Sequence, residues 1–221
     1  MPTLEELRQT RIQKLKSIRA GKKNPYPAQI RRDYKIKEVL NKFWLWRFVK
    51  KEFFLAGRIK TQRIHGRAAF FDLDDGSGKI QCFLRSANII GKKSYDEFIT
   101  DYDIGDFVEI KGSVFKTKKG EKTIRLKEIR MISKSLRPLP EKWHGLKDIE
   151  ERYRKRYLDI LMNPEVKKKF ITRSIIVKKI RNFFENQEFI EFETPNLQLI
   201  PGGATARPFK THLNALSLDL Y

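Results

Sequence analysis

The strongest constraint on the fold is a stretch of closely spaced, alternating apolar and polar residues between positions 53 and 84. Three runs of this kind, at 53–64, 67–74 and 79–84, each predict a β-strand, because successive side chains of a strand point to opposite faces. The last two runs are separated by Asp75-Gly76-Ser77-Gly78, residues that readily adopt the positive φ angles of a tight turn. The stretch therefore predicts consecutive strands of one sheet.

One face of these strands is expected to carry Arg63, Phe70 and Gln81, while Phe71 and Leu73 point to the other face. A guanidinium, a flat ring and an amide are the groups that an unstacked base and its phosphate require. The alternative is a half-buried hairpin whose aromatic residues belong to the core. Periodicity alone favours this second interpretation.

The chain downstream completes the pattern of a barrel. Residues 94–102 are typical of a helix, and further strands are expected at 107–116 and 123–133, with a change of phase near Lys127 that indicates a β-bulge. Three strands, a helix and two strands is the order of a five-stranded OB barrel. This fold binds single-stranded nucleic acid on the face of its second and third strands.

The residues before the barrel predict helices. Thr3 and Glu6 have the spacing of a capping box at the start of a helix over 3–19, and its basic face is either solvated or an RNA contact. The basic face consists of Arg8, Arg11, Lys14 and Arg19. The helix also has a rough apolar stripe, which consists of Leu4, Leu7, Leu15 and Ile18. A short helix is expected at 35–40. The aromatic run 43–48 either seals the end of the sheet or forms an exposed patch.

The last third of the chain predicts a second region. The expected elements are a charged helix at 148–161, a helix from Asn163 to about 186, a short strand at 189–193, a loop at 198–208 and a strand at 212–221. The long helix has an apolar stripe, which either faces a partner or packs on its own domain.

Charge and cysteine content limit the classes of function. The net charge of +21 favours a polyanion as partner, either nucleic acid or an anionic membrane. The single cysteine, Cys82, excludes a disulfide framework, so we expect a reducing compartment and a cytoplasmic location. The three histidines show no metal-ligand spacing, no apolar run has the length of a membrane span, and no metal site is expected.

Several segments, taken in order along the chain, carry a family resemblance. They are Asn24-Pro25-Tyr26-Pro27, Arg137-Pro138-Leu139-Pro140, Trp143-His144-Gly145-Leu146, Arg152–Asp159, Phe192-Glu193-Thr194-Pro195 and Pro201–Phe209. With the barrel, they resemble the N-terminal part of a class II lysyl-tRNA synthetase of bacterial type. The run PGGATARPF after a barrel and an ETP motif is the most specific of them.

The resemblance implies roles for individual residues. Phe70 matches the ring that stacks on the central uridine of the anticodon, and Gln81 matches the amide that pairs with the edge of that base. Arg63 matches a contact to a neighbouring anticodon base or phosphate, and Glu121 lies in the turn that recognises the third base. Gly202, Gly203 and Ala204 match a loop whose backbone approaches the lysine α-amino group.

The resemblance also implies a fold class and a domain plan. The class is α+β: an N-terminal helix and a five-stranded OB barrel, followed by an incomplete class II α/β catalytic domain. The expected parts are a basic helical extension at 1–50, the barrel at 51–135, a linker at 136–147 and the start of the catalytic domain at 148–221. Residues 163–195 match motif 1, the dimer interface of the family. Glu188 stands where the family usually has glycine, so we expect a different helix end.

The family attaches lysine to its tRNA and uses ATP and Mg²⁺, held by motifs 2 and 3. Neither motif is present in this sequence, so we expect no catalytic residue, binding of the anticodon stem-loop, and no ATP–pyrophosphate exchange by this polypeptide. Two alternatives remain. One is a free-standing OB nucleic-acid-binding protein. The other is a protein-interaction module built on motif 1 and the aromatic run 43–48.

Overall fold

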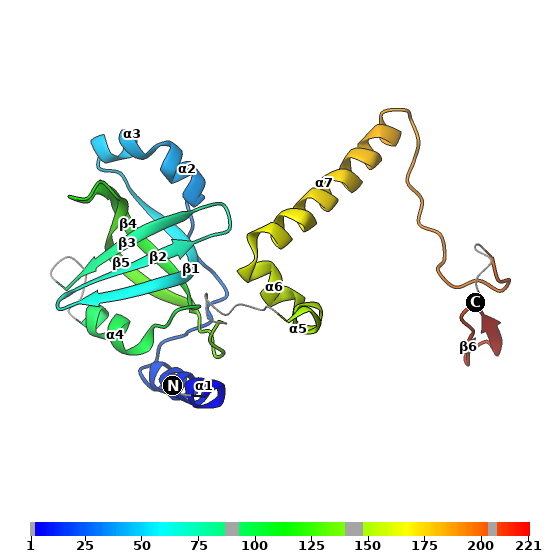
Figure 1. Ribbon diagram of the computed structural model, residues 1–221, viewed down its shortest axis with the longest axis horizontal. Coiled ribbons are helices and arrows are strands. Elements are labelled where there is room, and N and C mark those ends of the chain that lie inside the picture. Colours follow the sequence, from blue (N-terminus) through cyan, green and yellow to red (C-terminus); the bar gives the residue numbers. More distant parts are fainter. Residues whose placement is uncertain (1–2, 87–92, 140–147, 203–206) are drawn as a thin grey trace. The chain divides into compact units, whose positions relative to one another are not determined.

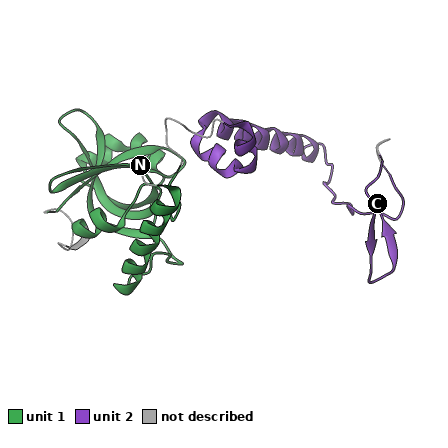
Figure 2. Ribbon diagram, turned by 60° about the horizontal axis from the view of Figure 1, so that its bottom comes forward, with its two compact units in different colours: residues 1–145 green, residues 146–221 purple. Residues whose placement is uncertain are grey.

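The computed structural model describes residues 3–86, 93–139, 148–202 and 207–221. These residues form two compact units, residues 1–145 and residues 146–221 (Figure 2). The helical extension before the barrel belongs to the first unit.

Unit 1 is built around a closed five-stranded barrel with the strand order β1-β2-β3-β5-β4 (Figure 1). The strands are β1 (Glu52–His65), β2 (Ala68–Asp74), β3 (Lys79–Arg85), β4 (Phe107–Lys116) and β5 (Lys122–Ser133). Neighbouring strands are antiparallel, except that β3 and β5 run parallel where the barrel closes. Helix α4 (Lys93–Asp101) connects β3 to β4, and the Phe98 ring lies 5.2 Å from the ring of Phe71. The OB barrel and the mixed α+β class are confirmed.

Alternation along each strand fills the barrel interior. Phe71, Leu73, Cys82 and Leu84 are fully buried, whereas Phe70 is only partly buried. The expected bulge is present: Lys111 pairs with Glu128 and Gly112 pairs with Leu126, so Lys127 has no partner opposite it in β4.

Helix α1 (Leu4–Ala20) starts with the predicted capping box, in which Thr3 and Glu6 bond reciprocally. Two of the four residues of its basic face, Arg11 and Lys14, contact the end of the barrel, whereas Arg19 is exposed. The Arg11 guanidinium donates to the carbonyl oxygens of Ile104, Ser135 and Arg137 at the end of the barrel. Lys14 pairs with Asp103 at 2.7 Å. Leu15 and Ile18 are buried, but Leu4 and Leu7 are exposed.

Two short helices precede the barrel, α2 (Ile36–Asn41), which was predicted, and α3 (Phe43–Phe48). The aromatic run 43–48 forms α3, and each of its two interpretations, a seal at the end of the sheet and an exposed patch, holds for one side of this helix. Phe43 and Trp46 are buried, and the Trp46 ring lies 5.0 Å from the ring of Phe53. Trp44, Leu45 and Phe48 are exposed.

Unit 2 contains α5 (Ile149–Arg154), α6 (Arg156–Met162), α7 (Pro164–Glu185), β6 (Thr211–Leu213) and β7 (Leu218–Leu220). The predicted single helix at 148–161 is wrong. The chain breaks at Lys155, where φ is −114°. The carboxylate of Asp159 then accepts hydrogen bonds from Arg152, Arg156 and Asn163, which holds the two short helices and the start of α7 together.

Two predicted strands of unit 2 are also wrong. Residues 189–193 form no strand, because no other strand in the described part of the chain pairs with them. Residues 212–221 form most of a hairpin, with Ser217 at a φ of 49° in the turn. After α7, Glu188 adopts a φ of 66°, and the Phe189 N–H donates to the Phe184 carbonyl. The glutamate thus takes the left-handed conformation that glycine adopts at lower cost.

Candidate nucleic-acid interface

The outer face of β1, β2 and β3 gathers the side chains that the sequence predicted for base recognition. Arg63 is paired with Phe70 across β1 and β2, and Phe70 with Phe83 across β2 and β3. Gln81 lies two residues before Phe83 on the same face, diagonally next to Phe70. The structure therefore brings Arg63, Phe70 and Gln81 together on one partly exposed surface.

The amide of Gln81 is held by a residue that sequence analysis missed. Thr123, in β5, is fully buried, and its Oγ1 donates a 2.9 Å hydrogen bond to the Gln81 carbonyl oxygen Oε1. The two residues are brought together by the parallel pairing of β3 with β5. Because this bond engages the carbonyl oxygen, the Gln81 amide presents its N–H groups, and a base can accept a hydrogen bond from them.

Three aromatic rings follow one another across this face. The Phe70 and Phe83 rings are 4.9 Å apart, and the Phe83 and Phe115 rings 5.9 Å apart. The guanidinium of Arg125 lies 4.8 Å from the centre of the Phe115 ring. We call Phe70, Phe83 and Phe115 the ring track. Phe83 could have been predicted from the sequence, by its spacing of two residues from Gln81. Phe115 reaches the ring track only because the barrel closes.

The turn between β2 and β3 is fixed by Asp75. Its carboxylate accepts hydrogen bonds from the N–H groups of Ile36, Ser77 and Gly78. Burial works to raise the pKa of Asp75, but these bonds and the Ser77 hydroxyl outweigh it and hold the pKa below its usual range. The hairpin that carries Phe70 and Gln81 is therefore anchored to α2.

Comparisons with known proteins agree with this geometry. Residues 53–132 match the family model described as "OB-fold nucleic acid binding domain", and residues 148–221 match "tRNA synthetases class II (D, K and N)". The chain is 47% identical to a lysine–tRNA ligase of Pelotomaculum thermopropionicum and 48% identical to one of Carboxydothermus hydrogenoformans, in each case over 99% of its length. A lysine–tRNA ligase of Clostridium botulinum is 44% identical over 98% of the chain.

This chain is homologous to the N-terminal part of lysine–tRNA ligases. It spans about two fifths of the length of these relatives, 42% of the first and 44% of the second. The OB barrel and the start of a class II synthetase region account for both family matches.

Of the remaining residues that the lysyl-tRNA synthetase resemblance singled out, Glu121 borders the barrel face. It is exposed in the β4–β5 turn, where its backbone N–H donates to Thr117 Oγ1 and its carbonyl oxygen lies 3.3 Å from Thr123 Oγ1, the hydroxyl that bonds Gln81. Gly202 is exposed in an irregular segment of unit 2. Gly203 and Ala204 lie outside the described residues.

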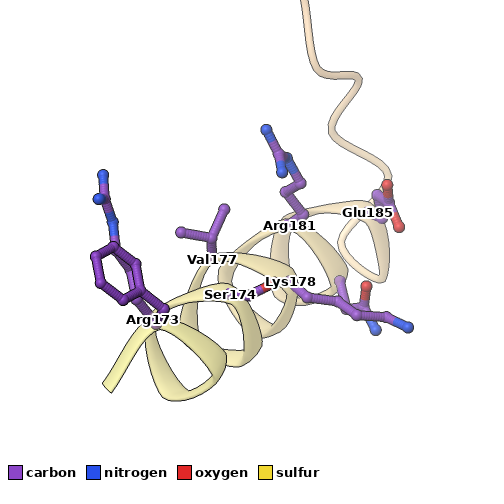
Figure 3. A pocket seen from close by; sticks show the side chains of 8 residues that line it. Arg173, Ser174, Val177, Lys178, Arg181 and Glu185 are labelled. Carbon is purple, nitrogen blue, oxygen red and sulfur yellow. The ribbon is translucent and has the colours of Figure 1, made fainter. Parts of the chain in front are cut away.

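Unit 2 shows a shallow hollow along α7, drawn in Figure 3. Its lining residues, which include Arg173, Lys178 and Arg181, all come from this one helix. Arg181 is paired with both carboxylate oxygens of Glu191 at 3.0 Å. A hollow on a single helix gathers no opposing groups and offers no catalytic arrangement.

The described residues, 3–86, 93–139, 148–202 and 207–221, contain no group of three His, Cys, Asp or Glu side chains able to hold a metal ion. No helix among them has the length and apolar character needed to cross a membrane.

Proposed function

We propose that this chain forms the tRNA-binding part of a lysine–tRNA ligase, and that the outer face of β1–β3 recognises the anticodon of the lysine tRNA. The observation that carries the proposal is the shared face of Arg63, Phe70 and Gln81, with the amide fixed by Thr123. Homology to lysine–tRNA ligases over nearly the whole chain supports the choice of tRNA.

The chemistry of the face matches an anticodon loop. Phe70 offers a ring for the central uridine, and stacking contributes about 1–3 kcal/mol per base. Gln81 donates to the edge of that base and so adds a preference for uridine. Arg63 binds a neighbouring base or phosphate, and Glu121 in the β4–β5 turn contacts the third base. Phosphate contacts add affinity that falls with salt but carry no sequence preference.

The second unit supports a homodimer of the whole protein through α7. Several large apolar side chains of this helix are more than half exposed, namely Phe183, Ile176 and Ile180, and others approach that value. An apolar helix face of this extent requires a covering surface. In the homologous ligases this segment corresponds to motif 1, and a second copy of the same helix is the proposed cover.

Attachment of lysine to tRNA, with ATP and Mg²⁺, is the proposed activity of the whole protein. Gly202, Gly203 and Ala204 are the proposed approach to the lysine α-amino group. The described residues offer no cluster of carboxylates for Mg²⁺. We therefore derive no catalytic step from this chain.

A titration of fluorescent RNA hairpins tests the proposal. A hairpin with UUU in its loop should bind at moderate salt, and a hairpin with a scrambled loop should bind less tightly. Phe70→Ala should weaken binding of the UUU hairpin about 5-fold or more, since it removes one stacking surface. Phe70→Tyr retains the ring and serves as the matched control.

The alternative function, a general single-strand-binding OB protein, is favoured by one observation. The ring track and its flanking Arg125 suit any base. Equal affinity for the UUU and scrambled hairpins would support this alternative and contradict anticodon recognition. Absence of RNA binding, together with self-association, would support a protein-interaction module.

A further inference from the structure

Helix α3 presents an exposed surface that anticodon recognition by the barrel face does not use. We call it the α3 surface, and it consists of Trp44, Leu45, Arg47, Phe48, Val49 and Lys50. Phe48 is 87% exposed and Trp44 57% exposed, although both lie in a helix whose other side is packed in the core. Large aromatic side chains that are left in water so close to a packed core need an explanation.

The α3 surface lies against the β4–β5 turn of the barrel. The Lys116 ammonium, at the end of β4, lies 5.4 Å from the centre of the Trp44 ring. The Lys122 ammonium, at the start of β5, lies 5.3 Å from the centre of the Phe43 ring. Phe115, the last ring of the track, precedes Lys116 in the same strand and points to the opposite face. The turn therefore lies between the ring track and the α3 surface.

This part of unit 1 is strongly cationic. Residues 42–51 contain Lys42, Arg47, Lys50 and Lys51 but no Asp or Glu, and Lys118 and Lys119 occupy the turn. Among the described residues, none of these six cations forms an ion pair with a carboxylate. Glu121 is the single carboxylate of residues 116–122. Exposed rings interleaved with unpaired cations are the composition of a single-stranded nucleic-acid surface.

The backbone supports a role for one of the lysines. Lys50 follows α3 in the left-handed conformation, with a φ of 50°, and the Lys51 N–H donates to the Trp46 carbonyl to close the helix. Glycine is favoured at such a position, because a side chain there is strained. The Lys50 side chain is exposed, and within the described part of the chain it forms no hydrogen bond or ion pair that would offset the strain.

From these observations we propose that the α3 surface is a second RNA contact. It would hold the nucleotides that leave the ring track over the β4–β5 turn, with Phe48 as a stacking ring and Lys50 as a phosphate contact. The inference rests on the proposed function, because the RNA is the one whose loop occupies the barrel face.

The chain offers a matched control for Lys50. Lys22 follows α1 in the same left-handed conformation, with a φ of 57°, but α1 packs at the other end of the barrel through Arg11 and Lys14 (Figure 1). Lys50→Gly and Lys22→Gly each remove one positive charge and relieve the same backbone conformation. They differ only in the surface on which the charge is lost.

The experiment titrates the full chain and its variants with the UUU hairpin at several salt concentrations. Phe48→Ala should weaken binding about 5-fold or more. Lys50→Gly should weaken binding and reduce the slope of log affinity against log salt by about 1, although its melting temperature is unchanged or higher. Lys22→Gly should bind as the wild type does.

Three results would overturn the inference while leaving anticodon recognition intact. In the first, Phe70→Ala weakens binding but Phe48→Ala and Lys50→Gly do not. In the second, both glycine variants lose affinity equally, which reports net charge alone. In the third, Phe48→Ala leaves RNA binding unchanged but abolishes binding to phosphatidylserine vesicles or self-association. Failure of the wild type to bind the hairpin would overturn both proposals.

Discussion

The hydrogen bond from Thr123 to Gln81 gives the sharpest test of how the barrel face distinguishes bases. Valine has nearly the shape of threonine and suits a β-strand, so Thr123→Val removes the hydroxyl and little else. The Gln81 amide, released from the 2.9 Å bond, is then free to turn its carbonyl oxygen toward the base. The variant should therefore lose preference for uridine before it loses the fold.

The magnitude follows from the hydrogen bond to Gln81, which is shorter than the 3.3 Å contact between the same hydroxyl and the Glu121 carbonyl. A neutral hydrogen bond contributes about 0.5–1.5 kcal/mol net, which corresponds to a factor of about 2–13 in affinity. The free energy of unfolding should change by less than about 1 kcal/mol, since the partly exposed Gln81 amide regains a partner in water. The loss should appear in the ratio of affinities for hairpins with UUU and UCU loops.

Thr123→Ser supplies the opposite control. It keeps the hydroxyl but removes a methyl group at a fully buried position, which costs about 1 kcal/mol of stability. Thermal unfolding followed by circular dichroism, with hairpin titration of each variant, separates the two effects. The valine variant should lose discrimination and keep stability, and the serine variant should do the reverse. An unchanged UUU-to-UCU ratio in Thr123→Val would refute the orienting role of the bond.

Four further predictions concern the folds of the two units. Gly112→Ala should destabilise unit 1 by about 2 kcal/mol or more in chemical denaturation, because its Cβ would overlap the backbone of β5 across the bulge; a melting curve like that of the wild type would contradict this. Glu188→Gly should raise the thermal stability of unit 2 by about 1 kcal/mol, because the φ of 66° is strained for glutamate, and Glu188→Ala should give no such gain. Cys82 should resist a thiol reagent until the barrel unfolds, because burial raises the pKa of its thiol well above the usual value and excludes the reagent; rapid labelling in buffer would show an open barrel. Burial works to raise the pKa of Glu109, but hydrogen bonds from the Arg31 backbone and from two guanidiniums outweigh it and lower the pKa. The stability that Glu109 contributes is therefore present above its usual pKa and should be lost as the pH falls below about 4, and a Glu109→Gln variant should show a shallower acid transition in unfolding titrations.

The sequence was a good guide wherever the evidence was local. Alternation with a period of two placed Phe70 outside and Phe71 inside the barrel, and the phase change near Lys127 located the bulge. The capping box of α1 also needs only neighbouring residues. By contrast, the strand predicted at 189–193 failed, because a strand requires a partner that alternation within the run cannot supply.

By itself, therefore, the sequence determined the order of the barrel strands and the face to which Arg63, Phe70 and Gln81 point, since both follow from pleat and turn geometry within a few residues. Only the tertiary structure decided how that face is completed. Parallel closure of β3 on β5 joins Gln81 to Thr123, 42 residues away, and brings Phe115 to the end of the ring track. It also divided α3 into a buried and an exposed side. These contacts come from the closing of a barrel, which no pattern within one segment encodes.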